Sequence, residues 1–204
     1  IICALESKYH MVTLVYIHGA NATGTSWNYL RSLVPATSEY VLEYSCSNKF
    51  EDNLQAMSKE ITNLDKVFYV GHSLGGIYAY HLANKGLARC VGGLSISTPF
   101  GGVSSAYLLG LLFPFYSLFQ DIKPNSKAIT SIRGLKNNRN WTQIVTRRGN
   151  NPLINGKNDG VITVSSQQQI DCRKIVMEFS HNEILQSPEV AGLIISLSGL
   201  NLTT

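Results

Sequence analysis

The chain has 204 residues, of which 44% are hydrophobic and 15% are charged. This length supports one well-filled core and is short for two domains, so we expect a single domain over residues 1–204. No apolar run approaches the roughly 18 residues of a membrane span, and we expect a soluble protein. The formal net charge is only +4, and no nucleic-acid-binding motif surrounds the basic clusters. These features argue against a nucleic-acid partner and leave transient contact with an anionic membrane surface open.

The cysteines are dispersed, without the spacing of metal ligands. They are Cys3, Cys46, Cys90 and Cys172. We expect buried free thiols, with disulfides as the alternative that an even count allows, and neither a metal site nor another cofactor. Without a basic leader at the start we expect a cytoplasmic location, with a processed N-terminus as the alternative.

The first half of the chain alternates strands and helices. Apolar runs predict strands at 11–17, 41–46 and 66–70, and apolar positions at helical spacing predict helices at 24–35, 53–64 and 77–85. Near-continuous apolar runs suit strands buried on both faces. The alternation therefore predicts an α/β fold with a mostly parallel sheet and right-handed crossovers.

The second half interrupts this alternation with an unusually apolar segment. Strands are predicted at 90–97, 141–147 and 174–179, a polar loop at 149–160, and a closing helix at 188–197. Residues 104–120 are more apolar than a surface helix requires. They are either a buried helix pair on the sheet or part of a small cap, over about 103–140, that covers an apolar substrate.

A Gly-x-Ser-x-Gly motif follows the strand at 66–70. In Gly71-His72-Ser73-Leu74-Gly75, the glycines permit a sharp strand-to-helix turn that exposes the hydroxyl of Ser73. The N–H of Leu74, at the start of the new helix, faces the place where a substrate oxygen gains charge. The plainer alternative is a glycine-rich connection with an exposed serine, and a base elsewhere in the chain decides between them.

His181 and Asp159 complete a possible catalytic set. Loops at the carboxyl ends of parallel strands meet at one edge of a sheet, and His181 directly follows the last predicted strand. A histidine can take the serine proton when a carboxylate holds its other nitrogen, and Asp159 precedes it on a neighbouring loop. Asp121 and Asp171 are alternative carboxylates, and Asp159 is alternatively a turn former beside Gly160.

The remaining histidines have other expected roles. His72 is expected to point away from the site as a packed turn residue, and His18 to orient the loop at Gly19-Ala20. His10 and His81 are expected to be incidental.

Taken together, these motifs resemble the α/β-hydrolase superfamily, in its lipase and serine-esterase branch. The residues that carry the resemblance are His18-Gly19, Gly71-His72-Ser73-Leu74-Gly75-Gly76, Thr98-Pro99-Phe100-Gly101-Gly102, Asn158-Asp159-Gly160-Val161 and Ser180-His181. The resemblance implies a minimal fold of about six strands with helices on both faces, lacking the family's antiparallel first hairpin. It also implies Ser73 as nucleophile, Asp159 and His181 as its partners, and the N–H groups of Ala20 and Leu74 as the oxyanion hole. Phe100 stands where this branch often has histidine, so this segment does not assign a substrate class.

We therefore expect a carboxylic ester hydrolase that acts on small-molecule or lipid esters with apolar acyl groups through an acyl-enzyme. Tyr107, Leu112 and Phe115 are expected to line the acyl-binding wall. An acyltransferase or thioesterase with the same triad is one alternative. A non-catalytic lipid-binding module is another.

Overall fold

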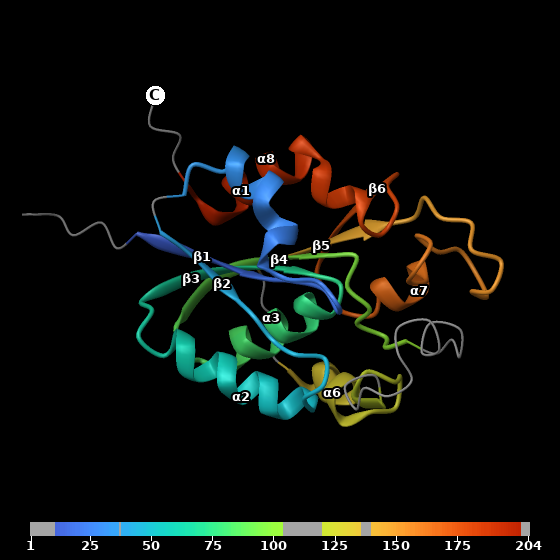
Figure 1. Ribbon diagram of the computed structural model, residues 1–204, viewed down its shortest axis with the longest axis horizontal. Helices are drawn as coiled ribbons and strands as arrows, with labels where there is room; N and C mark the ends of the chain where they lie inside the picture. The colour runs from blue at the N-terminus through green and yellow to red at the C-terminus, as the bar shows by residue number, and fades with distance from the viewer. Residues whose placement is uncertain (1–10, 37, 104–119, 136–139, 201–204) are drawn as a thin grey trace, which may run out of the picture.

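A computed structural model describes residues 11–36, 38–103, 120–135 and 140–200, which form one parallel sheet flanked by helices (Figure 1). The sheet order is β2-β1-β3-β4-β5-β6, and every neighbouring pair is parallel. The strands are β1 (Val12–Ile17), β2 (Glu39–Leu42), β3 (Lys66–His72), β4 (Arg89–Ile96), β5 (Trp141–Thr146) and β6 (Arg173–Met177). The predicted six-stranded parallel sheet is confirmed.

Helices cover both faces of the sheet (Figure 1). One face carries α1 (Asn28–Leu33) and α8 (Pro188–Ser198), and the other carries α2 (Phe50–Ile61), α3 (Leu74–Lys85) and α6 (Lys127–Thr130). The shorter elements are the 3-10 helices η1 (Gly24–Trp27), η2 (Ser131–Gly134) and η3 (Glu183–Gln186), and helix α7 (Val164–Gln167). This arrangement leaves the edge at the carboxyl ends of the strands to the connecting loops.

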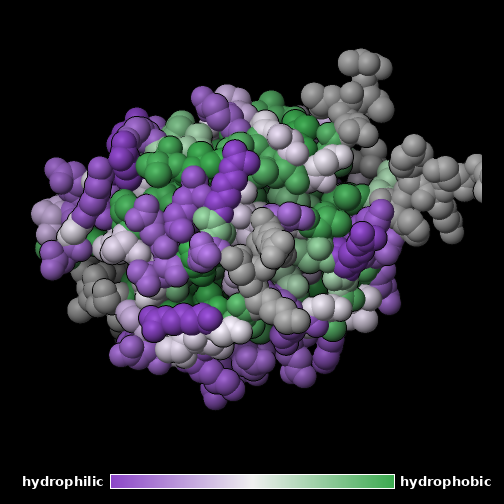
Figure 2. All heavy atoms as spheres, turned by 180° about the vertical axis from the view of Figure 1, so that it is seen from behind, coloured by the Kyte–Doolittle hydropathy of each residue, from purple (hydrophilic) through white to green (hydrophobic). Residues whose placement is uncertain are grey.

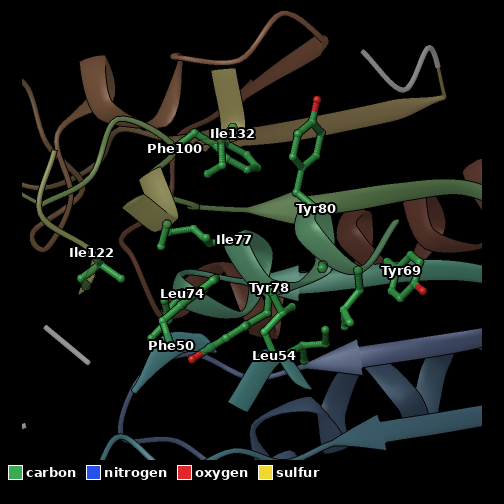
Figure 3. Close-up of a cluster of buried hydrophobic side chains, with 14 of the residues drawn as sticks. Phe50, Leu54, Tyr69, Leu74, Ile77, Tyr78, Tyr80, Phe100, Ile122 and Ile132 are labelled. Carbon is green, nitrogen blue, oxygen red and sulfur yellow. The ribbon is translucent and has the colours of Figure 1, made fainter. Parts of the chain in front are cut away.

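Each face of the sheet has its own hydrophobic core. Successive side chains of a strand point to opposite faces, so Val15 and Ile17 of β1 pack toward α2 and α3, while Leu14 and Tyr16 pack toward α1 and α8. Figure 3 shows the first core, in which aromatic and aliphatic side chains of α2 and α3 meet. Burying each large apolar side chain contributes about 1.5–3 kcal/mol, and the two cores together hold the central strands rigidly in place.

Several predicted boundaries differ from the observed ones. β2 ends at Leu42 rather than at residue 46, and α2 begins at Phe50 rather than at residue 53. The carboxylate of Asp121 accepts the N–H of Phe50 at 2.9 Å, which satisfies a backbone group at the start of α2. Phe50 also continues the apolar stripe of Leu54, Met57 and Ile61 at helical spacing, so the earlier start agrees with the local pattern as well as with this contact.

The predicted cap lies mostly outside the described residues, including Tyr107, Leu112 and Phe115. Residues 120–135 of this range are described and contain α6 and η2. Ile122, Ile129 and Ile132 are buried in the same core as α3, and Figure 3 shows Ile122 and Ile132 there. The choice between a buried helix pair and a cap was stated for residues 104–120, which lie outside the described residues except for Gln120. A cap over residues 104–119 and the single-domain organisation stay predictions.

Figure 2 shows hydrophilic and hydrophobic residues interspersed over the face seen from behind. Within the described ranges, no helix is both long enough and apolar enough to cross a bilayer.

Cys46 is a buried free thiol, as expected, whereas Cys90 and Cys172 are only half-buried, and Cys3 lies outside the described residues.

Candidate active site

Ser73 occupies the single position between β3 and α3. Its φ is 52° and its ψ is −124°, a strained conformation for a residue with a side chain. Glycines make the turn possible, because a Cβ at Gly71 would overlap Gly76, and a Cβ at Gly75 would overlap the carbonyl oxygens at the end of β1. The Ser73 N–H donates to the carbonyl of Ile96 in β4 at 2.8 Å. The turn is therefore fixed to both neighbouring strands, with the serine half-buried at the edge of the sheet.

The structure brings Ser73, His181 and Asp159 into one hydrogen-bonded chain. The hydroxyl oxygen of Ser73 lies 3.0 Å from Nε2 of His181, and Nδ1 of His181 lies 2.9 Å from Oδ2 of Asp159. The backbone N–H of His181 also donates to the carbonyl of Asp159 at 3.0 Å, which ties the two loops together. Asp159 is fully buried and His181 is 5% exposed. The distances and the burial fit those that a serine–histidine–aspartate triad requires.

The buried carboxylate of Asp159 has a complete set of hydrogen-bond donors besides His181. Oδ1 accepts the N–H groups of Val161 and Ile162 at 3.0 and 2.7 Å, and Oδ2 accepts the hydroxyl of Thr146 and the amide of Gln167 at 2.6 and 3.1 Å. Burial alone would raise the pKa of Asp159, but its hydrogen bond and charge interaction with His181, and the other donors, outweigh burial and lower that pKa. The carboxylate is therefore held ionised.

The N–H groups of Ala20 and Leu74 remain the predicted donors of an oxyanion hole. Leu74 is the first residue of α3, so its N–H has no acceptor within the helix and lies at the positive end of the helix dipole. Ala20 lies in the loop after β1, and it lines the same cavity as Ser73 and His181. This cavity has a volume of about 420 Å³, and the apolar side chains of Val161 and Leu185 line its other side. It is the space in which a reacting group could contact Ser73.

The environments of the other histidines differ in part from expectation. His72 is buried, but the expectation that it points away from the site is wrong, because its Nε2–H donates to the carbonyl of His181 at 2.8 Å. Burial, and the proximity of His181, lower the pKa of His72 to about 3, so it is neutral. His18 is 1% exposed and contacts the loop that it precedes. His81 contacts the carbonyl of Ala128 at 2.9 Å, and His10 lies outside the described residues.

The alternative carboxylates lie elsewhere. Asp121 accepts the first N–H of α2. Asp171 lies two residues before the start of β6, at the end of the sheet opposite Ser73. Asp159 is the carboxylate that meets His181. Among the described residues, no group of three His, Cys, Asp or Glu side chains is placed to hold a metal ion.

Two residues beside Asp159 escaped the sequence-based prediction. Thr146 ends β5, and Gln167 accepts its N–H at 2.9 Å and donates to its carbonyl at 3.0 Å. Gln167 therefore forms hydrogen bonds both with the last residue of β5 and with the carboxylate of Asp159. The signal for Thr146 was a polar residue at the carboxyl end of a buried strand, but nothing distinguishes Gln167 within the run Gln167-Gln168-Gln169.

No protein-family model matches the sequence, and no curated protein is similar enough in sequence to count as a relative. Solved structures are similar in fold. Bacillus licheniformis lipase BlEst2 in its mature form has a TM-score of 0.74 at 15% identity, with 93% of each chain covered. A carboxylesterase of Nitrososphaera gargenis has a TM-score of 0.62 at 13% identity, covering 93% of this chain and 90% of its own.

A thioesterase domain from the curacin biosynthetic pathway is similar as well, with a TM-score of 0.61 at 14% identity and 91% of each chain covered. These three proteins have the α/β-hydrolase fold in common. Given the parallel order of its six strands and the strained serine between β3 and α3, this chain has the α/β-hydrolase fold.

Proposed function

We propose that this protein hydrolyses carboxylic esters with apolar acyl groups, with Ser73 as nucleophile, His181 as general base and Asp159 as the orienting carboxylate. The observation that carries the proposal is the chain of hydrogen bonds from Ser73 through His181 to Asp159, with distances of 3.0 and 2.9 Å. A strained serine, a buried base and an ionised carboxylate rarely meet at the edge of a parallel sheet without a catalytic role.

The reaction follows from these positions. His181 Nε2 takes the proton of Ser73 as the serine oxygen attacks the ester carbonyl, and the carbonyl oxygen becomes an oxyanion. The N–H groups of Ala20 and Leu74 donate to it. The proton on Nε2 then passes to the alcohol as the ester C–O bond breaks, which leaves an acyl-serine. A water, deprotonated by His181, attacks the acyl-serine and releases the acid and the free serine.

The similar solved structures are consistent with this chemistry, since they include a lipase and a carboxylesterase. They also include a thioesterase domain, which makes thioester hydrolysis the second candidate. The two reactions share every step except the leaving group, a thiol in place of an alcohol. The preference for apolar acyl groups rests on the apolar lining of the cavity and on the predicted wall of Tyr107, Leu112 and Phe115.

Labelling with a fluorophosphonate tests the nucleophile. The reagent forms a covalent bond with an activated serine, so it should label the parent protein at Ser73, and Ser73→Ala should abolish both labelling and turnover. Peptide mapping identifies the modified residue. Labelling at another serine, or none in the folded parent, would contradict the proposal and favour a non-catalytic lipid-binding module.

A series of p-nitrophenyl esters from acetate to octanoate tests the acyl preference. Burying each further methylene contributes about 0.8 kcal/mol, so kcat/KM should rise from acetate to octanoate. Acyl-thioesters of matched chain length measure the second candidate. Equal rates on acetate and octanoate would remove the apolar acyl preference, and faster turnover of thioesters would assign the thioesterase.

A further inference from the structure

We propose that Glu43, an exposed residue just beyond the end of β2, positions the oxyanion loop, defined as residues 19–23. This inference rests on the proposed function, because it assigns a role to Glu43 in the same reaction. Glu43 does not contact the cavity that holds Ser73. It acts through His18 and through Gly24, which lie on either side of the oxyanion loop.

The contacts of the Glu43 carboxylate join the two ends of the loop. Its Oε1 accepts the N–H of Gly24 at 2.7 Å, and its Oε2 lies 2.9 Å from Nε2 of His18. The sheet places Glu43 there, because Ile17 pairs with Leu42 in the register of β1 and β2, so the next residue of each strand also comes close. One side chain thus holds both the residue before the loop and the residue after it.

The contact with His18 extends to the peptide that carries the proposed oxyanion donor. Nδ1 of His18 lies 2.8 Å from the carbonyl oxygen of Gly19, to which it donates. That carbonyl belongs to the same peptide unit as the N–H of Ala20. No peptide bond in the described chain is cis, and in a trans peptide the C=O and N–H point in opposite directions. Fixing the Gly19 carbonyl toward His18 therefore directs the Ala20 N–H away from it.

Tyr44, the residue after Glu43, keeps the His18 ring in this orientation. The two rings stack with centroids 4.4 Å apart and planes 6° from parallel, and the Tyr44 hydroxyl donates to the His18 carbonyl at 3.1 Å. His18 is 1% exposed, whereas the Glu43 side chain is 58% exposed.

The plain alternative is that Glu43 forms a surface ion pair without consequence. Exposed ion pairs contribute little to stability, so in that case removal of the Glu43 carboxylate would change little. The two readings differ in what they predict for turnover. A misplaced oxyanion donor weakens binding of the transition state and leaves binding of the ester unchanged.

The experiment compares Glu43→Ala and Glu43→Gln with Glu39→Ala. Glu39 is a matched control. It also forms an ion pair, with Arg31, but it is the first residue of β2, at the end of the strand away from Glu43. The measurements are kcat and KM on p-nitrophenyl butyrate, the inhibition constant of an alkylboronic acid that forms a tetrahedral adduct with serine, and the melting temperature.

For Glu43→Ala we expect kcat to fall about 10- to 100-fold, less than the roughly 100- to 1,000-fold loss on removing an oxyanion donor outright. KM should stay within about two-fold, and boronate affinity should weaken by the same factor as kcat. Glu43→Gln should recover most of kcat, because its amide can accept from Gly24 and donate to His18. Glu39→Ala should match the parent in kcat, and the two alanine variants should melt at similar temperatures, since neither change removes core packing.

Two results would overturn the proposal while the ester hydrolase stands. One is a kcat for Glu43→Ala in the range of Glu39→Ala. The other is a loss of kcat that follows a lower melting temperature with boronate affinity unchanged. A parent protein that turns over no ester and takes no fluorophosphonate label would instead refute the proposed function, and the role of Glu43 with it.

Discussion

At the scale of single residues, Asp159 determines which nitrogen of His181 carries a proton. Oδ1 accepts two backbone N–H groups, and Oδ2 faces Nδ1 of His181, the Thr146 hydroxyl and the Gln167 amide. Every neighbour of the carboxylate is a donor. Both carboxylate oxygens must therefore act as acceptors. A protonated carboxyl group would place a hydrogen against one of these donors, so the carboxylate has to be ionised.

Replacing Asp159 with Asn should cut kcat/KM by roughly 10³- to 10⁴-fold. The amide oxygen would stay on the backbone N–H groups of Val161 and Ile162, so the amide NH₂ would face Nδ1 of His181. Nδ1 would then be the acceptor, Nε2 would carry the proton, and it could not take the proton of Ser73. Steady-state kinetics on a p-nitrophenyl ester measure the loss. Asp121→Asn is the control and should keep its kcat, and a loss there instead would reassign the carboxylate.

His72 should make the protein sensitive to acid. Burial, and the proximity of His181, lower its folded-state pKa to about 3, whereas a histidine in an unfolded chain has a pKa of about 6.5. The unfolded state therefore binds a proton that the folded state excludes. The stabilising contribution is complete above pH 6.5 and is lost progressively as the pH falls toward 3.

The test compares the parent with His72→Gln, whose amide can still donate to the His181 carbonyl. Between pH 6 and 4, the free energy of unfolding of the parent should fall more steeply than that of the variant, by about 1.4 kcal/mol per pH unit. Urea unfolding at several pH values gives both curves. Parallel curves would show that His72 does not titrate in this way.

At the scale of elements, α3 approaches β1 closely because Gly75 has no side chain. A Cβ at Gly75 would overlap the carbonyl oxygens of Ile17 and His18, and both are backbone atoms that cannot move aside. The close approach brings the start of α3, with Ser73 just before it, against the start of the oxyanion loop. The Gly-x-Ser-x-Gly pattern therefore fixes a helix-to-strand distance as well as a turn.

Gly75→Ala should lower the free energy of unfolding by about 3 kcal/mol or more, at the upper end of the cost of overpacking. Gly192→Ala is the matched control. Gly192 lies exposed in α8, where an added Cβ meets nothing within 4 Å, so alanine should stabilise the protein by about 0.5–1 kcal/mol through helix propensity. Urea unfolding of the two variants measures both changes, and equal effects would contradict the close approach.

Elements were predictable where one local pattern sufficed. The strands with near-continuous apolar runs and the helices α3 and α8 were found from sequence, because burial imposes a pattern on many consecutive residues. The short helices α6 and α7 were missed, since four residues show no periodicity. The contacts of Glu43 and Gln167 were missed for a different reason: they depend on strand register and on loop placement, which no local pattern encodes.

At the scale of the whole molecule, the site is assembled from loops that are distant in sequence. Ser73 and His181 are 108 positions apart, and Asp159 precedes His181 by 22. Their convergence could be predicted, because the loops after parallel strands meet at one edge of the sheet. The orientation of His72 could not, since it depends on where the loop after β6 passes.

The order of the strands also places Ser73, His181 and Glu43 after strands at different positions in the sheet. Ser73 follows the central strand β3, but His181 follows β6 and Glu43 follows β2, and these two strands end the sheet on its opposite sides. A terminal strand has backbone hydrogen bonds to one neighbour only, so it opens locally at a lower free energy than a central strand. Amide hydrogen exchange should accordingly be faster in β2 and β6 than in β1 and β3.

Activity should then disappear before the fold does. The only two tryptophans, Trp27 and Trp141, are at most 1% exposed and report on the two cores. With increasing urea, ester turnover should fall at a lower concentration than tryptophan fluorescence changes, and coincident midpoints would contradict this expectation. If the midpoints separate, mild denaturing conditions would inactivate the protein by local opening of the terminal strands β2 and β6. The turn that carries Ser73 would stay folded, so activity would return when these strands close again.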